Sequence, residues 1–345
     1  MPVDTHQQLH RLPKLDLHRH IEGSVSPSTL RELYFKSTGK LLPLSYFKRL
    51  LILDRHTGSL DEFLSRLATP YLKKYVHTVE DLLFVFDQAV ADAAADNLNY
   101  LEIRFALSNF LGLDHQPETL IGKIAAKLDQ ASQEYGCPTK LIITLKRDDS
   151  LEVSEFVVKL ARKLYQGKHI VGLDLAGNEH LFGNHLFVNL TRQIHRYDIP
   201  LVVHAGEASG PESVRSAILD LHAHRVSHGV RAVEDSATMA LIREKDILLE
   251  VCPTSNLDTG LYSSYDQLPI TTFIKQKVPF LICTDDPVTS GITLSSEVAS
   301  LIDHGLLTLE NYRRQLATAL NHTFSPLPKS RLSTSRTPHF LEPVS

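Results

Sequence analysis

Short runs of β-branched and aliphatic residues recur along the chain, and each run ends in polar or glycine residues. Runs of this length are typical of buried strands. Between most of them the apolar positions follow a helical spacing, as in Val79–Asn97, where they recur every three or four residues. The pattern predicts eight strands, at Lys14–His20, Tyr100–Phe105, Lys140–Leu145, Ile170–Leu175, Pro200–His204, Arg225–His228, Ile247–Cys252 and Pro279–Cys283.

Strands that alternate with helices usually form a parallel sheet. Eight strand and helix units in a chain of this length favour an α/β fold of the closed (β/α)8 type, a TIM barrel. An open doubly wound sheet is the alternative, but it normally has fewer strands, and no G-x-G-x-x-G motif follows any predicted strand. In a barrel, side chains at the C-terminal strand ends face one pocket, so residues far apart in sequence can meet there.

The connection over residues 21–99 is much longer than the others and contains several helical patterns, including residues 60–74. We interpret it as a helical insertion after the first strand, a lid that covers the pocket mouth and excludes water. An insertion that only supports the barrel wall is the alternative. We expect residues 10–324 to form a single domain, and residues 325–345, rich in proline, serine and arginine, to form a disordered tail.

The composition is that of an ordinary soluble protein, with 43% hydrophobic and 22% charged residues in a chain of 345. A formal net charge of −4, without a dense run of lysine and arginine, argues against binding to nucleic acid or to an anionic membrane. The chain has no apolar run long enough to span a membrane, and its first ten residues lack the features of a secretory signal. We therefore expect a cytoplasmic protein with a small-molecule partner, whose oligomeric state stays open.

The cysteines limit the kinds of metal site that are possible. The three of them, Cys137, Cys252 and Cys283, are widely spaced and form no C-x-x-C motif. This spacing suggests neither a disulfide framework nor a thiolate zinc site. Any metal must be held by histidine and carboxylate.

Histidines lie at the predicted strand ends. His18 and His20 are two residues apart on one strand, so both imidazoles point to the same side. With 18 histidines in 345 residues, chance alone gives about one such H-x-H pair. The pair His222 and His224, which precedes a strand, is the internal control, and we expect it on a solvated helix end.

The other strand ends carry similar groups. His204 follows an apolar run, with Glu207 three residues later, and His228 ends the next strand. Asp285 and Asp286 emerge together from the last strand, which is costly unless they bind a cation or hydrogen-bond donors. The pair Asp148-Asp149 is again a control, because Lys146-Arg147 precedes it and can neutralise it in a solvated loop.

Three imidazoles and one carboxylate form a ligand set suited to a divalent transition metal, with zinc as the default. Such a set leaves a position for water, whose pKa zinc lowers towards roughly 7. The chain has no H-E-x-x-H helix, no G-x-S-x-G elbow and no P-C-x-x-C motif of the thiolate-zinc deaminases. The residues therefore favour metal-assisted hydrolysis, while buried structural histidines are the simpler alternative.

Together these segments resemble the adenosine deaminase family of zinc aminohydrolases, in the family's order and over roughly residues 10 to 325. Each motif alone is weak, but their combination is highly specific. The matching segments are Pro13–Gly23 (PKLDLHRHIEG), Tyr100–Phe105 (YLEIRF), Gly172–Glu179 (GLDLAGNE), Val203–Glu207 (VHAGE), Arg225–Gly229 (RVSHG), Glu250–Gly260 (EVCPTSNLDTG) and Thr284–Pro287 (TDDP).

The resemblance implies one zinc ion per chain, and its ligands would be His18, His20, His204 and Asp285. It also implies that water activated by the metal attacks a purine at C6. The other implied roles are proton donation to purine N1 by Glu207, orientation and deprotonation of the water by His228, a bond to N7 from Asp286, and a bond to N3 from the backbone N–H of Gly177.

Glu22 departs from the family pattern. Many members carry aspartate at this position, where the carboxylate resembles the group that binds the ribose 5′-hydroxyl, and glutamate resembles the adenine deaminase branch. The segments Pro253–Asn256 and Thr284–Asp286 look more like bacterial adenosine deaminases. We therefore expect deamination of adenosine and 2′-deoxyadenosine. The alternatives are adenine, an N6-substituted purine or a modified nucleoside as substrate, amide or phosphoester cleavage, and a barrel that binds purines without turning them over.

Overall fold

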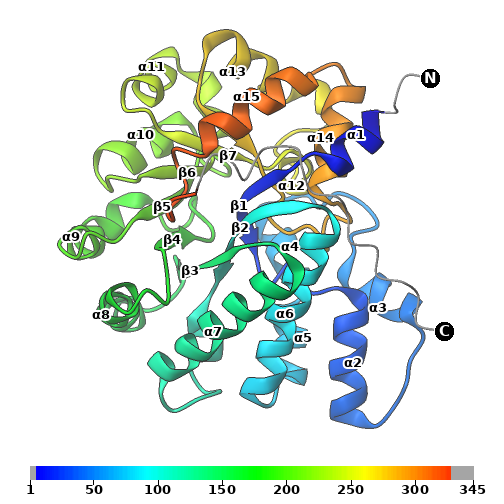
Figure 1. The fold of residues 1–345 in the computed structure, drawn as a ribbon. Helices are drawn as coiled ribbons and strands as arrows, with labels where there is room; N and C mark the ends of the chain where they lie inside the picture. Colours follow the sequence, from blue (N-terminus) through cyan, green and yellow to red (C-terminus); the bar gives the residue numbers. More distant parts are fainter. Residues whose placement is uncertain (1–4, 328–345) are drawn as a thin grey trace.

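A computed structural model of the protein describes residues 5–327, and it has the predicted barrel architecture (Figure 1). Eight strands form one sheet in the order β1 to β8, and all neighbours in this order pair in parallel. The strands are β1 Lys14–His20, β2 Leu98–Phe105, β3 Thr139–Lys146, β4 Gly172–Ala176, β5 Leu201–Ala205, β6 Arg225–His228, β7 Leu248–Val251 and β8 Phe280–Ile282. The predicted strands Lys14–His20 and Arg225–His228 match these bounds, and the ends of the others differ from them by at most two residues.

The last strand returns to the first at the C-terminal end of the barrel. The backbone N–H of His20 donates to the carbonyl of Asp285 at 2.9 Å, and the N–H of Asp285 donates to the carbonyl of His18 at 2.8 Å. A parallel bridge between Arg19 and Asp285 joins the same two segments. The chain after β8 is thereby fixed beside the end of β1, which brings residues from the two ends of the sequence together.

Helices surround the barrel and cover its outer face (Figure 1). They are α1 Thr5–Arg11, α2 Pro27–Thr38, α3 Leu44–Leu51, α4 Leu60–Ser65, α5 Thr69–Tyr75, α6 Val79–Ala95, α7 Pro117–Tyr135, α8 Leu151–Gln166, α9 Val188–His195, α10 Pro211–Leu219, α11 Ser236–Glu244, α12 Pro253–Asp258, α13 Ile270–Gln276, α14 Leu294–Asp303 and α15 Leu309–Ala319. Short 3₁₀ helices occur at Leu107–Phe110, Asn184–Phe187, Val230–Glu234 and Tyr265–Gln267.

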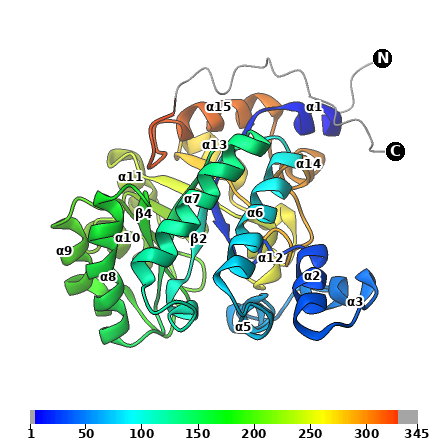
Figure 2. The same ribbon diagram turned by 60° about the horizontal axis from the view of Figure 1, so that its bottom comes forward.

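The long connection after β1 contains α2 to α6. Figure 2 shows α2, α3 and α5 at one end of the barrel and α1 at the opposite end. The helical pattern over residues 60–74 forms two helices, α4 and α5, rather than one. Pro70 lies in the first turn of α5, where its missing N–H costs nothing, whereas inside a continuous helix it would remove a hydrogen bond.

Backbone hydrogen bonds attach this insertion to the barrel. The backbone N–H of Leu53 donates to the carbonyl of Thr289 at 2.9 Å, and the N–H of Thr57 donates to the carbonyl of Asp258 at 2.8 Å. The N–H of Ala68 donates to the carbonyl of Glu22 at 3.2 Å. Their acceptors lie in or beside the segments that end β1 and follow β7 and β8. The insertion is therefore held against the C-terminal end of the barrel.

Two further sequence predictions concern the C-terminal tail and the absence of a membrane-spanning helix. The predicted tail begins at residue 325, and its residues 328–345 lie outside the described range. Within the part of the chain that the structure describes, no helix is both long enough and apolar enough to cross a membrane.

Glu297 on α14 is a buried carboxyl group that should make stability depend on pH. Burial raises its pKa from 4.5 to about 7, although the backbone N–H of Thr254 donates to it at 2.7 Å. The folded state therefore binds the proton more tightly than the unfolded state. This contribution is complete below pH 4.5 and is lost as the pH rises to 7, by at most about 3 kcal/mol.

We expect Glu297→Gln to weaken this pH dependence. Between pH 5 and pH 8, the free energy of unfolding, measured with urea, should fall less in the variant than in the wild type. The exposed Glu244 is a matched control, and Glu244→Gln should leave the pH dependence unchanged. Equal pH dependence in wild type and Glu297→Gln would show that Glu297 ionises normally.

Candidate metal and catalytic site

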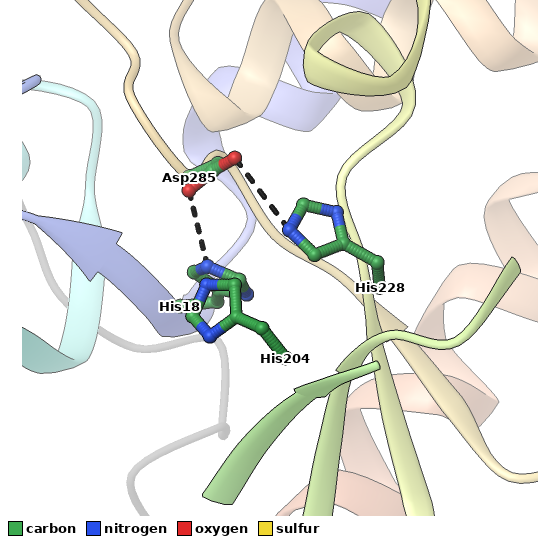
Figure 3. A group of neighbouring side chains, drawn as sticks. All are labelled: His18, His204, His228 and Asp285. Atoms are coloured by element: carbon green, nitrogen blue, oxygen red, sulfur yellow. Dashed lines mark ion pairs between the residues drawn. The ribbon is translucent and has the colours of Figure 1, made fainter. Parts of the chain in front are cut away.

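Polar side chains from four strand ends meet at the C-terminal end of the barrel. Figure 3 shows His18 of β1, His204 of β5 and His228 of β6 around Asp285, which follows β8. Each offers a nitrogen or oxygen atom, and these atoms all lie within 4.8 Å of one another. All four residues are buried. The barrel thus brings together side chains separated by up to 267 positions in the sequence (285 minus 18).

His20 lies at the edge of this group. Its Nε2 is 3.3 Å from His204 Nε2 and 3.6 Å from Asp285 Oδ1. Asp285 Oδ1 is also 3.1 Å from His18 Nε2, and Asp285 Oδ2 is 3.8 Å from His228 Nε2. The four predicted ligands therefore lie close together, with His228 as a fifth neighbouring donor, and the choice of ligands among the five stays a prediction.

The donor set fits a divalent cation. Neither ring nitrogen of His18 has a hydrogen-bond partner among the described residues, and Nε2, which faces Asp285, is therefore available to a metal. Burial lowers the pKa of His20 to about 3 and lowers that of His204 and His228, which leaves these imidazoles neutral, as metal ligands must be. Burial alone would raise the pKa of Asp285, but the surrounding histidines hold it well below its usual value.

The buried charged side chains beneath the site also favour a bound divalent cation. Among the described residues, the buried guanidinium of Arg104 contacts Asp174 and Glu250, and His18 lies between Glu250 and Asp285. Apart from any proton on His18, whose pKa is raised against the effect of burial by Asp285 and Glu250, three carboxylates share one guanidinium, an excess of two negative charges (three minus one). A divalent cation would balance them, whereas Arg225 and Glu102 pair with each other.

Local backbone geometry turns two of these side chains inward. His228 and Asp285 have φ angles of 59° and 60°, in the left-handed region that residues other than glycine seldom adopt. Such strain is concentrated at functional sites, where the surrounding structure maintains it. His228 ends β6 and Asp285 follows β8, and in both cases the turn directs the side chain toward the shared centre.

A cavity of about 370 Å³ opens over this centre. Its inner wall comes from strand ends and its outer wall from the insertion. It is lined by His20, Glu22, Ala106, Asn109, Thr144, Lys146, Asp148, Ala176, Gly177, His204, Glu207, His228, Asp285 and Asp286, and on the insertion by Leu60, Phe63, Leu64, Leu67, Thr69, Pro70 and Lys73. Every residue predicted for substrate binding or catalysis lines it.

Glu207 is a buried acid facing His228, with 3.7 Å between Oε2 and Nε2. Burial, together with the charges of Asp285 and Glu179, raises its pKa well above the usual value. Glu179 also shapes the loop that carries Glu207, because its carboxylate accepts from the backbone N–H of Gly206, Glu207 and Ser209 at 3.0, 2.7 and 2.8 Å. Glu179 was not predicted as a site residue, although it ends the quoted segment GLDLAGNE.

Asp286 and Glu22 form the opposite wall of the cavity. A Cβ atom on Gly23 would lie 1.9 Å from Asp286 Oδ1, so only glycine allows Asp286 its position. Burial and the charges of Asp285 and Glu22 raise the pKa of Asp286 well above its usual value. Glu22 accepts the backbone N–H of Ala106 at 3.2 Å, and burial raises its pKa to about 6.

Neither control motif contributes a residue to the candidate metal group, although Asp148 lines the same cavity. His222 and His224 are exposed and lie between α10 and β6, as expected for an H-x-H pair without a function in the pocket. Lys146 neutralises Asp149 and Asp148, with Nζ to Oδ distances of 3.2 and 3.7 Å. The expectation that Arg147 helps in this was wrong, because its buried guanidinium donates to the carbonyls of Phe182 and His204 instead.

Comparisons with known proteins identify the family of this chain. The model of the adenosine deaminase family matches residues 13–336. An adenosine deaminase of Clostridium botulinum (strain Hall) is 32% identical over 330 residues, which are 94% of this chain and 97% of the relative.

Two solved structures share the fold at lower identity. The adenine deaminase of Arthrobacter aurescens is 22% identical, with a TM-score of 0.82, over 93% of this chain and 96% of that one. A zinc-bound amidohydrolase from Burkholderia ambifaria is 20% identical, with a TM-score of 0.80, over 95% and 89%. The match of the family model, together with the bacterial relative, shows that the chain belongs to the adenosine deaminase family.

Proposed function

We propose that the protein is a zinc-dependent hydrolase that deaminates adenosine and 2′-deoxyadenosine to the corresponding inosine products and ammonia. The observation that supports this most directly is the cavity in which Glu207, His228 and Asp286 surround a group of potential metal ligands. The proposed ligands are His18, His20, His204 and Asp285. When bound, zinc would polarise a water molecule and lower its pKa.

Glu207 is the proposed general acid at purine N1. Addition of water to C6 pushes an electron pair onto N1, so a proton delivered there lowers the barrier. Burial and the neighbouring charges of Asp285 and Glu179 raise the pKa of Glu207, which favours the protonated carboxyl that this role requires. The tetrahedral carbon then expels its amino group as ammonia, and a 6-oxopurine remains.

His228 is the proposed proton acceptor for the attacking water. Its Nδ1 lies 3.1 Å from Asn256 Nδ2, whereas Asn256 Oδ1 is buried without a hydrogen-bond partner. With this amide rotated so that Oδ1 faces His228, Oδ1 would accept the Nδ1 proton and Nε2 would keep a lone pair toward the cavity. The buried imidazole is neutral at pH 7, as a base must be.

Asp286 and Gly177 are the proposed anchors for the purine ring. N7 is a hydrogen-bond acceptor, so Asp286 can bind it only as a protonated carboxyl group, in agreement with its raised pKa. Gly177 lines the same cavity with a φ of 108°, a conformation that favours glycine. In this role its backbone N–H would donate to N3, and together the two bonds would hold C6 in place.

The insertion is proposed as the lid of the pocket. Residues of α4 and of the segment that leads to α5, among them Phe63 and Leu67, form an apolar outer wall. A closed wall of this kind excludes bulk water from the reacting groups. The alternative of a purely supporting insertion does not account for these contacts with the cavity.

Adenine is the main rival substrate, because Glu22 resembles the adenine deaminase branch. The cavity supports the nucleoside, since at about 370 Å³ it extends beyond the strand ends to Asn109 and the insertion. We expect adenosine to be turned over with a higher kcat/KM than adenine, measured as the loss of absorbance near 265 nm. The panel should include 2′-deoxyadenosine, an N6-methylated purine and an N6-methylated nucleoside.

A second arm of this experiment examines Glu22 itself. Glu22→Asp shortens the side chain toward the form that resembles the ribose-binding group, so it should preserve or raise kcat/KM for adenosine relative to adenine. Turnover of the free base faster than of adenosine by the wild type would contradict the choice of substrate. It would leave the deaminase chemistry intact.

A further inference from the structure

Arg104 on β2 is a buried guanidinium with no role in the reaction above. Its side chain is 0% exposed and lies inside the barrel beneath the candidate metal group. Nη1 donates to Ser227 Oγ at 2.8 Å and lies 3.4 Å from Asp174 Oδ1, while Nη2 donates to Glu250 Oε2. Nη2 also donates to the carbonyl of Leu17 at 3.3 Å.

Each carboxylate held by Arg104 faces a different histidine of the metal group. Asp174 Oδ1 is 3.0 Å from His204 Nδ1, and Glu250 Oε2 is 3.4 Å from His18 Nδ1. In both histidines Nε2 is the nitrogen that faces the other members of the group. A single guanidinium on β2 therefore connects, through carboxylates on β4 and β7, to imidazoles on β5 and β1.

We propose that Arg104 is a positioning residue that holds Asp174 and Glu250 so that they fix the ring orientation and tautomer of His204 and His18. With a proton kept on each Nδ1, both Nε2 atoms keep a lone pair toward the centre, ready to bind a divalent metal. This rests on the proposed function only in that His18 and His204 are metal ligands. It makes no assumption about the substrate.

The chemistry of arginine suits this arrangement. A planar guanidinium can donate to two carboxylates at once in a fixed geometry, whereas a lysine ammonium is a point charge on a flexible stem. Without the guanidinium, the buried carboxylates of Asp174 and Glu250 would lose their shared positive charge and could turn away from the imidazole rings. Loss of such an outer partner typically lowers metal affinity 10- to 100-fold.

The test measures metal binding rather than turnover. Zinc affinity would be determined by competition with a chromophoric chelator, and the ligand geometry would be followed by the visible spectrum of the Co²⁺-substituted protein. Arg104→Lys is expected to bind zinc roughly 10- to 100-fold more weakly than the wild type and to change the Co²⁺ spectrum. Asp174→Asn and Glu250→Gln should each lower the affinity as well, and the double variant Arg104→Lys/Asp174→Asn should lose less than the two single losses combined.

Glu102 provides a matched control for stability. It pairs with Arg225 inside the same barrel and is equally buried, and it accepts hydrogen bonds from the Tyr100 hydroxyl and the Phe324 backbone N–H rather than from a histidine of the metal group. Glu102→Gln should therefore lower the melting temperature of the metal-free protein without changing zinc affinity or the Co²⁺ spectrum. If Arg104→Lys does not fold, Ser227→Ala is the milder substitute, because Ser227 Oγ bridges Arg104 and Glu250 at 2.8 and 2.9 Å.

The outcomes separate this role from a structural one. The proposal would be overturned if folded Arg104→Lys had wild-type zinc affinity and an unchanged Co²⁺ spectrum. If Arg104→Lys does not fold, the same result in Ser227→Ala would overturn it. So would an equal loss of zinc affinity in Glu102→Gln. A wild-type protein that binds zinc but does not deaminate any purine would refute the proposed function while leaving the role of Arg104 intact.

Discussion

Replacement of Glu207 by glutamine should lower kcat for adenosine by roughly two to four orders of magnitude, the usual contribution of a general acid. Glutamine has nearly the same size and can still form hydrogen bonds, but it has no acidic proton to give to N1. Zinc content and the affinity for a non-reactive purine nucleoside should stay close to wild type. The measurements are steady-state kinetics, metal analysis and calorimetric titration with the analogue.

Asp148 offers a matched control for this substitution, because it lines the same cavity and is not assigned to the reaction. Asp148→Asn makes the same change from carboxyl to amide and should keep kcat within a few fold of the wild type. Full activity in Glu207→Gln would show that another group protonates the purine. A wild-type protein that binds the analogue but has no turnover would instead favour the purine-binding barrel without catalysis.

Removal of the metal should abolish turnover and also lower thermal stability. A cation that binds only the folded state adds about 2.7 kcal/mol when its concentration is 100 times Kd. Because two buried negative charges lack a partner among the described residues, the metal-free barrel should be distinctly easier to unfold. Dialysis against a chelator, followed by calorimetry and by titration with zinc, would measure both effects.

The control for this experiment is the second H-x-H pair. The double variant His222→Ala/His224→Ala should retain one zinc ion and its stabilising effect, since this pair lies apart from the candidate metal group. His18→Ala should lose both the bound zinc ion and its stabilising effect. A fully active protein that contains no metal after dialysis would refute the proposed role of zinc.

The fold could be predicted well from the sequence because each strand is a short apolar run that ends in a polar group. The barrel then places all strand ends at one face, which is why His18, His204, His228 and Asp285 could be expected to meet. The interruption of the helix between α4 and α5, just before Pro70, was not predicted. The helical spacing of apolar residues continues across it, although the helical backbone is interrupted there.

Contacts below the site were beyond the reach of the sequence pattern. Asp174, Glu179 and Arg104 lie on buried strands or beside them, where a charged residue gives no indication of its partner. Their roles depend on which ring nitrogen or backbone N–H they face, and this follows from side-chain directions in three dimensions. For the same reason, Arg147 could be taken for a surface counter-ion although its side chain turns inward.

The division of the cavity between strand ends and insertion has a consequence for how new specificities arise. The groups proposed to break the C–N bond belong to the barrel. The apolar residues of the outer wall lie in another stretch of the same sequence, and they are Leu60, Phe63, Leu64 and Leu67. Exchange or redesign of that segment can therefore alter which molecules are admitted while the reaction is inherited unchanged. A laboratory library confined to residues 52–75 would sample new substrates from a single contiguous stretch of the gene.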